Sequence, residues 1–266
     1  MIFNLKVSKS FDLDKTLDCG QCFRWYKNSN IWYGVVSGYL AKACIKDNFL
    51  QIETELSSEK FWRLYFDLEF DYEKLKQYFF KFGSVLSEAT NENFGIHILN
   101  QEPWETLCSF IISQNNNIPR IKRIIECFCK YFGKKSGDIY SFPDYKIIAK
   151  LEINDLEPIK AGFRSKYILD AARRISNLEI DLEKIKAMST RDALGALQHI
   201  NGVGPKVAAC TMLYGFHRLD SFPVDIWIKK VLDKYFKNLD IDFGEYRGLA
   251  QIYLFNWGRS HSEYFK

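Results

Sequence analysis

The spacing of apolar residues changes partway along the chain, and this change limits the possible folds more than any other feature. In the first quarter, short aromatic and β-branched runs alternate with Asn, Ser, Gly and Asp, as in CFRWYKNSNIWYGVVSGYLAKACIKDNFLQIET. This pattern is typical of antiparallel strands joined by turns. From SSEKFWRLYF onward, the apolar residues recur at helical spacing, at Phe61, Leu64, Tyr65 and Leu68. The sequence therefore predicts a sheet followed by helices.

We expect an α+β protein in two parts. An N-terminal antiparallel sheet domain would occupy residues 1–92, and a mostly α-helical region residues 93–266. In the second part, Pro103 and Pro205 stand where helices are predicted to begin, and Gly133 stands where one is predicted to end.

Composition narrows the class of protein. Of the 266 residues, 47% are hydrophobic and 16% aromatic, which is enough for packed cores. The apolar runs are far shorter than the roughly 20 residues that span a bilayer. The N-terminal stretch MIFNLKVSKSFDLD lacks the features of a signal peptide, so we expect a cytoplasmic protein with no membrane partner. A net charge of +4 permits a polyanionic partner without requiring one.

The seven cysteines stand in apolar surroundings, which favours reduced core residues. Cys19 and Cys22 in DCGQC have redox-motif spacing, but no strand–helix pattern surrounds them. No cysteine follows Cys210, which excludes a cysteine-ligated iron–sulfur cluster at that end. We therefore expect no metal site among the cysteines.

The stretch HINGVGPKVAAC carries the strongest indication of chemistry. Gly202 and Gly204 allow a tight turn and a close backbone approach, and Pro205 suits the first turn of the helix that follows. Free N–H groups at a helix start bind phosphate without reading sequence. Such turns also occur as plain helix connectors, so the hairpin alone is weak support.

A second stretch, FPVDIWIKKVL, strengthens this interpretation. Taken alone, Asp225 reads as a helix N-cap and Lys206 as a solvated surface lysine. Taken together with the hairpin, they suggest a nucleophile and its electrostatic partner. A partly desolvated amine at the positive end of a helix is favoured in its neutral, nucleophilic form. A carboxylate would stabilise positive charge that develops nearby.

The hairpin, the Gly/Pro-rich loop and the aspartate resemble the helix–hairpin–helix DNA glycosylase superfamily. Within it, a lysine at the position of Lys206 implies the bifunctional glycosylase/lyase type. The resemblance implies that this amine attacks the sugar C1′, displaces the base and leaves a Schiff base, after which β-elimination cuts the strand. No metal or organic cofactor is needed, although a cation could bridge the hairpin carbonyls and a phosphate.

Six stretches in order along nearly the whole chain, GQCFRW, SQNNNIPRI, AGFRSKY, GVGPKVAAC, PVD and AQIYLF, resemble the 8-oxoguanine DNA glycosylase family. The resemblance implies a TBP-like sheet domain followed by a helical HhH-GPD glycosylase region. It also implies a monomer that binds double-stranded DNA containing 8-oxoguanine, removes that base preferably opposite cytosine, and so acts in base excision repair.

The resemblance also implies site roles. Gly20 would offer its carbonyl to the N7–H that guanine lacks, Cys210 and Phe255 would sandwich the flipped base, and Gln251 would bond its pyrimidine edge. The remaining predicted DNA contacts, besides Gly202 and Gly204, are Asn115 in the vacated space, Arg120 and Arg164 on the orphaned cytosine, and Phe163 as a wedge.

Three positions depart from the eukaryotic pattern. Phe163 replaces a tyrosine, Trp227 a phosphate-contacting histidine, and Gly258 the acid paired with that histidine. The compact chain looks more like a prokaryotic form, acting on nucleoid-associated DNA. Two alternatives stay open: a glycosylase of the same type for another damaged base, and a non-catalytic DNA-binding module. The latter gives no reason for Lys206 together with Asp225.

Overall fold

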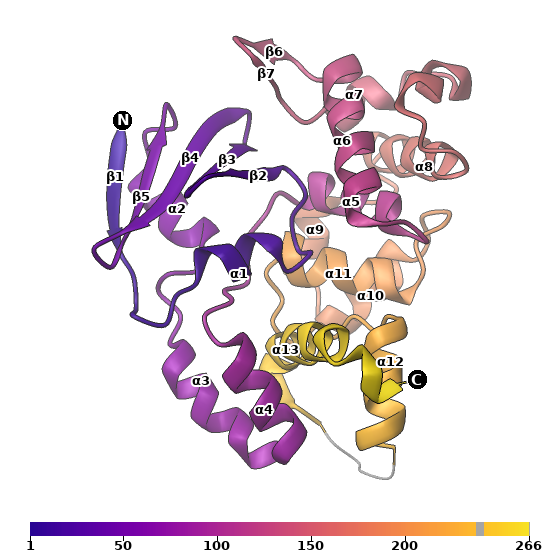
Figure 1. Cartoon of the computed structure of the whole chain (residues 1–266). Coiled ribbons are helices and arrows are strands. Elements are labelled where there is room, and N and C mark those ends of the chain that lie inside the picture. Colours follow the sequence, from indigo (N-terminus) through magenta and orange to yellow (C-terminus); the bar gives the residue numbers. More distant parts are fainter. Residues whose placement is uncertain (238–241, 266) are drawn as a thin grey trace.

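The structure, a computed structural model, describes residues 1–237 and 242–265 (Figure 1). An antiparallel sheet with strand order β1-β5-β4-β3-β2 forms its N-terminal part, as predicted. Its strands are β1 (Ile2–Lys6), β2 (Trp25–Asn28), β3 (Ile31–Val36), β4 (Tyr39–Lys46) and β5 (Phe49–Thr54). None of the helices in the described ranges combines the length and apolar character needed to span a bilayer.

The sheet packs against α1 (Leu13–Asp18) and α2 (Glu59–Tyr65). Burial alternates along β3, as expected for a strand with one face in a core. The core beneath the sheet includes the fully buried rings of Trp25 and Trp62. Trp25 also donates from its indole N–H to Tyr65 Oη at 2.9 Å, so the polar edge of the ring is satisfied inside the core.

Helices dominate the rest of the chain and share a second core. They are α3 (Tyr72–Phe79), α4 (Ser84–Asn93), α5 (Pro103–Ser113), α6 (Ile118–Phe132), α7 (Tyr145–Ile148), α8 (Arg164–Ser176), α9 (Leu182–Ala187), α10 (Thr190–Leu197), α11 (Pro205–Gly215), α12 (Ile226–Tyr235) and α13 (Arg247–Ser260). Short 3-10 turns lie at residues 80–82, 153–159, 244–246 and 262–265. The predicted starts at Pro103 and Pro205 and the predicted end at Gly133 are confirmed.

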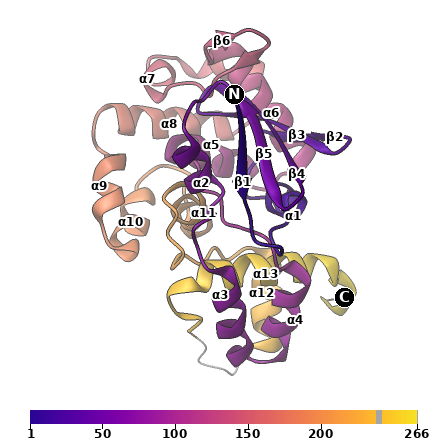
Figure 2. The same ribbon diagram turned by 90° about the vertical axis from the view of Figure 1, so that its left-hand side faces the viewer.

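Helix α4 packs against α13, and α3 lies beside α4 (Figures 1 and 2). Their apolar residues, such as Leu75 and Leu86, belong to the core of the helical region. The division of the chain at residues 92 and 93 stays a prediction. A two-stranded ladder that the sequence did not suggest, β6 (Lys135–Ser136) with β7 (Ile139–Tyr140), follows α6. Strands of two residues are too short to show a period.

All seven cysteines are free, and five of them are buried. The cysteines therefore serve mainly as core residues, as expected.

A buried histidine lies on the segment that connects the two parts of the chain. The ring of His97 is 3% exposed and stacks on Tyr72 with centroids 3.8 Å apart. Its Nδ1 lies 3.0 Å from the Phe66 carbonyl oxygen, whereas its Nε2 is buried without a partner. Burial lowers the pKa of His97 to about 4, because a charged ring would place an unpaired N–H in the core.

We expect His97 to make stability depend on pH between about 6.5 and 4. Because its pKa in the folded state is lowered, the unfolded chain takes up the proton first as pH falls, and folding loses about 3 kcal/mol over this window. Urea unfolding of the wild type and of His97→Gln at several pH values measures the effect. The difference in unfolding free energy between the two should shrink toward acid pH. The exposed His199 supplies the control variant, His199→Gln, whose pH profile should match the wild type.

Candidate active site

The hairpin between α10 and α11 places a helix start at the surface. Gly202 has φ +78, and a Cβ there would overlap the ring of Tyr167, so only glycine fits. The hairpin is held to α8 by Asp170, which accepts from the Asn201 N–H at 2.8 Å. Gly204 is the N-cap of α11 and makes no side-chain cap hydrogen bond. The first-turn N–H groups are therefore available to an anion.

Lys206 follows at the second position of α11 and is half-buried. Its Nζ lies 3.5 Å from Ser113 Oγ and 4.8 Å from the centroid of the Phe110 ring. Cys210, one turn further along α11, is buried. Burial raises the pKa of the Cys210 thiol, while the charge of Lys206 lowers it and that of Asp225 raises it. The amine and the carboxylate therefore both act on the same buried sulfur.

Asp225 is the N-cap of α12, as predicted, and its Oδ1 accepts from the Ile228 N–H at 2.9 Å. Within the described part of the chain, no carboxylate lies within 4.0 Å of the Lys206 amine. The Asp225 side chain is therefore held by its capping hydrogen bond and forms no ion pair with Lys206. A fixed, half-buried carboxylate that lacks a cationic partner can respond to positive charge on a bound molecule.

The loop after α1 meets the same region. Gly20 has φ +88, which favours glycine. Three residues later, the Phe23 ring contacts Phe110 edge-on at 5.8 Å, and Phe110 stacks on Tyr214 of α11 at 5.4 Å. The loop of Gly20, helix α5 and helix α11 therefore converge around Phe110, which also lies under the Lys206 amine.

Helix α13 supplies two further predicted residues, one turn apart. Gln251 is buried, and its Oε1 has no hydrogen-bond partner. Phe255 is half-buried, with the Arg259 guanidinium 5.3 Å from its ring centroid. A buried amide oxygen without a donor requires an explanation, and a ligand that presents an N–H would satisfy it.

The structure brings the predicted duplex contacts together at a second location. Phe163, 49% exposed, is the N-cap residue of α8, and the Arg164 guanidinium lies 4.4 Å from its ring centroid. Arg164 is buried and donates to the carbonyl oxygens of Gln114, Asn115 and Ala161. Burial, and then the charge of Arg120, lower the pKa of Arg164. Arg164 therefore ties the Asn115 loop to α8, a structural contact that the sequence did not suggest.

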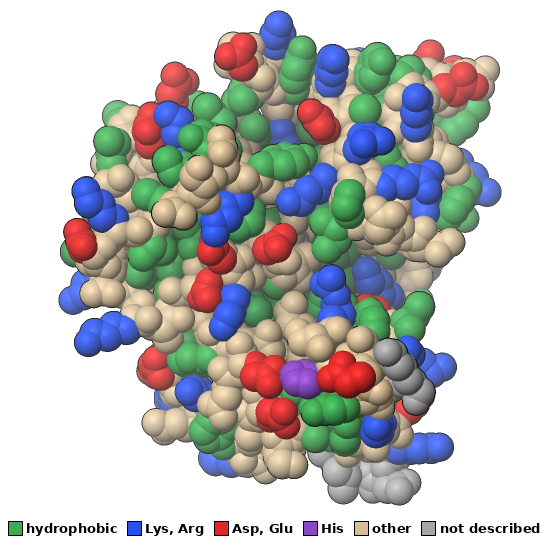
Figure 3. All heavy atoms as spheres, in the orientation of Figure 1, with side chains coloured by type: hydrophobic (Ala, Val, Ile, Leu, Met, Phe, Trp, Pro, Cys, Tyr) green, Lys and Arg blue, Asp and Glu red, His purple; other side chains and the backbone are tan. Residues whose placement is uncertain are grey.

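Asn115 itself is exposed and has φ +46 between α5 and α6. Asparagine tolerates this left-handed conformation better than most residues. On the face shown in Figure 3, Lys and Arg side chains gather over α5, α6 and α8. The Asn115 loop joins α5 to α6, two of the helices that carry this basic surface, and such a surface suits a polyanion.

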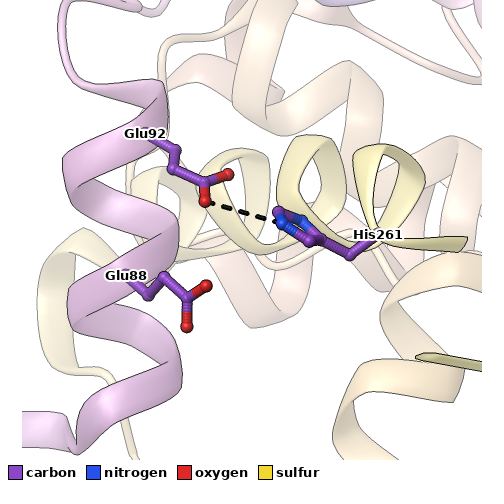
Figure 4. A group of neighbouring side chains, drawn as sticks. All are labelled: Glu88, Glu92 and His261. Carbon is purple, nitrogen blue, oxygen red and sulfur yellow. Dashed lines mark ion pairs between the residues drawn. The ribbon is translucent and has the colours of Figure 1, made fainter. Parts of the chain in front are cut away.

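Among the described residues, one cluster has the spacing of possible metal ligands: Glu88 and Glu92 of α4 with His261, which follows α13 (Figure 4). Their ligand atoms lie within 4.8 Å of one another, and His261 Nε2 is 3.6 Å from Glu92 Oε1. Both carboxylates are exposed, and the histidine–glutamate pair accounts for the arrangement. None of the three was a predicted site residue.

Sequence reasoning overlooked several residues that shape the site. Phe110 and Ser113 line the amine of Lys206, Asp170 anchors the hairpin, and Gln21 fixes the loop of Gly20. Gln21 and Ser113 lie inside the motifs GQCFRW and SQNNNIPRI, so a signal was present for both. Phe110 and Asp170 stand in ordinary helical stretches, where nothing local distinguishes them.

A glycine hairpin followed by a lysine and a capping aspartate, on helices that follow an antiparallel sheet, defines a helix–hairpin–helix DNA glycosylase. Residues 4–107 match the 8-oxoguanine DNA glycosylase N-terminal domain, and residues 108–242 match the HhH-GPD superfamily base excision DNA repair protein family. The chain belongs to the 8-oxoguanine DNA glycosylase family of this superfamily.

Individual relatives agree with this assignment. A probable N-glycosylase/DNA lyase of Methanothermobacter thermautotrophicus is 30% identical over 73% of this chain and 72% of its own. The 8-oxoguanine glycosylase/lyase of Clostridium acetobutylicum, solved with double-stranded DNA containing cytosine opposite 8-oxoG, has a TM-score of 0.89 at 34% identity and covers 98% of both chains. A structure of MBOgg1 with a low-affinity DNA ligand has a TM-score of 0.89 at 37% identity, covering 98% of this chain and 96% of its own.

The hairpin glycines supply a matched pair of variants. Gly202→Ala should lower the free energy of unfolding by about 2 kcal/mol or more, because φ is positive and the new methyl overlaps Tyr167. Gly204→Ala adds a methyl in open space at an ordinary negative φ, so its effect should stay within about 1 kcal/mol, the cost of alanine in place of glycine as an N-cap. Chemical denaturation measures both. Equal effects at the two positions would contradict this account of the hairpin.

Proposed function

We propose that this protein is a bifunctional DNA glycosylase/AP lyase that flips 8-oxoguanine out of duplex DNA and excises it, preferably opposite cytosine. The observation that carries the proposal is the position of Lys206 at the uncapped start of α11, with its amine over Phe110 and the fixed carboxylate of Asp225 nearby. The family of the chain and the names of its relatives support the same reaction.

In this proposal the lesion is read by one backbone group. Oxidation at C8 converts N7 of guanine from an acceptor to a donor, so the Gly20 carbonyl attracts the lesion and repels guanine. Cys210 and Phe255 hold the two faces of the base, and Gln251, whose Oε1 is free, bonds its pyrimidine edge. One such contact contributes roughly 1–3 kcal/mol. Base flipping and placement of the transition state must therefore add to the discrimination.

Chemistry begins when the Lys206 amine, after it has given up a proton, attacks C1′ of the flipped nucleotide. A bond forms between Nζ and C1′ as the bond from C1′ to N9 breaks, and the base leaves with the electron pair of that bond. Asp225 stabilises the positive charge on the sugar. Loss of the amine protons and ring opening give an imine, which acidifies the hydrogen at C2′. Its removal expels the 3′ phosphate and nicks the strand.

Several groups would grip the duplex. The N–H groups around Gly202 and Gly204 bind a phosphate, and a bridging cation is compatible with this contact. Asn115 fills the vacated space, Phe163 wedges beside it, and Arg120 reads the orphaned cytosine. Arg164 joins this contact only by releasing carbonyl oxygens to which it donates in the free protein. We further propose that the enzyme needs no cofactor, since lysine itself supplies the nucleophile. It would act as a monomer on cytoplasmic, nucleoid-associated DNA of a prokaryotic cell.

Lys206→Gln should abolish both base release and strand cleavage while lesion binding persists, because the amide cannot form an imine. The measurement uses a labelled duplex with 8-oxoguanine opposite each of the four bases, incubated with enzyme and borohydride. We expect a trapped complex with the wild type, strongest opposite cytosine. The exposed Lys60 on α2 gives the control Lys60→Gln, which should trap normally. Wild-type excision by Lys206→Gln would show that another group is the nucleophile, and trapping on preformed abasic sites alone would indicate a different damaged base.

Asp225→Asn separates the structural role of this residue from its charge. Asparagine is as good an N-cap as aspartate, so the unfolding free energy should change by less than about 0.5 kcal/mol. The rate of base excision should fall by roughly 100-fold or more, because the developing positive charge loses its carboxylate. Asp225→Ala, which removes the cap as well, should lose both stability and rate. Single-turnover excision rates and chemical denaturation, measured on the same protein preparations, separate the effect on catalysis from the effect on stability. An unchanged rate in Asp225→Asn would reduce the residue to a cap.

A further inference from the structure

A buried glutamine fixes the loop that carries Gly20. The side chain of Gln21 is 1% exposed, and every polar atom in it has a partner. Its Nε2 donates to the carbonyl oxygens of Thr16 and His97, each at 2.8 Å. Its Oε1 accepts from the Leu99 N–H at 2.9 Å. One amide therefore joins the end of α1 to the segment that connects the two parts of the chain.

A second glutamine extends this contact to the helix of the nucleophile. Gln101 donates from Nε2 to the main-chain oxygen of Gln21 at 2.8 Å. Its own main-chain N–H donates to the oxygen of Tyr214 at 3.0 Å. Tyr214 belongs to α11, which begins one residue before Lys206. A continuous series of hydrogen bonds thus runs from the loop of Gly20 to the helix that carries the amine.

The orientation of the Gly20 carbonyl depends on this series. That carbonyl belongs to the peptide group shared with Gln21, and Gly20 itself imposes little restriction at φ +88. On the other side, Cys19 is buried and its thiol donates to the Thr16 oxygen at 3.3 Å. A glycine peptide in a loop would otherwise rotate readily, and a rotated carbonyl could not discriminate donor from acceptor.

We propose that Gln21 and Gln101 are positioning residues that set the Gly20 carbonyl at a fixed place relative to the Lys206 amine. The base edge is read by the loop while the sugar of the same nucleotide is attacked from α11. Selectivity for the lesion therefore requires a fixed distance between the loop of Gly20 and the start of α11. This inference rests on the proposed function, and it assigns the lesion selectivity of that site to two side chains that touch neither base nor sugar.

The test measures binding in the full-length Lys206→Gln background, so that no substrate turns over. Three duplexes are compared, with 8-oxoguanine, guanine or a tetrahydrofuran abasic analogue opposite cytosine. The analogue has no base, so its affinity reports the duplex contacts without the Gly20 carbonyl. Gln21→Leu and Gln101→Leu are introduced separately. Gln101→Leu removes a single side-chain hydrogen bond and leaves its main-chain bond to Tyr214, so it decides the matter should Gln21→Leu fail to fold.

We expect each variant to bind the 8-oxoguanine duplex roughly tenfold more weakly, with tetrahydrofuran affinity unchanged within about twofold. The control is Gln51→Leu, which loses one hydrogen bond to Asn4 on the sheet. Its affinities for the 8-oxoguanine and tetrahydrofuran duplexes should stand in the same ratio as those of the Lys206→Gln background protein. The positioning role would be overturned if a variant lost the same affinity for the 8-oxoguanine and the tetrahydrofuran duplexes, or lost affinity for neither. A background protein that does not prefer 8-oxoguanine over guanine would instead overturn the proposed function itself, which separates the two failures.

Discussion

The burial of helix α11 is the constraint on which the rest of the site depends. Every residue from Val207 to Gly215 is buried, so this helix presents no face to solvent. A helix that is apolar all round must lie inside a core, and here it packs against α5 through Tyr214 and Phe110. Its N-terminal end alone reaches the surface. A reactive side chain on α11 that must meet DNA can therefore stand only at that end, where Lys206 stands.

The surroundings of Lys206 follow from the same packing. Because α11 is central, residues from α5 and from the start of α12 face it, and the loop of Gly20 packs on α5 through Phe23. Charges in such a place are screened less than at the surface, so Asp225 influences the Cys210 thiol although it lies in no ion pair with Lys206. The candidate site therefore lies at an edge of the core, where the N-terminal end of the buried helix α11 reaches the surface.

Sequence reasoning reached those features that depend on neighbours in the chain. The hairpin at Gly202, the cap at Asp225 and the helix start at Pro205 are local, and the structure has each of them. What the sequence could not supply were contacts between distant segments. Gln21 forms a hydrogen bond with a residue nearly eighty positions away in the chain, and Arg164 donates to a carbonyl oxygen fifty positions away. No period or turn residue encodes such contacts, because they exist only once the chain has folded.

The two helix starts of the site show how function and stability divide between them. At α12 the aspartate caps its own helix, which such a cap stabilises by about 1 kcal/mol relative to alanine. At α11 the N-cap is Gly204, which satisfies none of the first-turn N–H groups. In the proposed function a phosphate binds here, and a serine or aspartate would occupy one of the N–H groups that it needs. The uncapped helix start is therefore a local weakness that the packing of Val207 to Gly215 offsets, and it leaves N–H groups available to an anion.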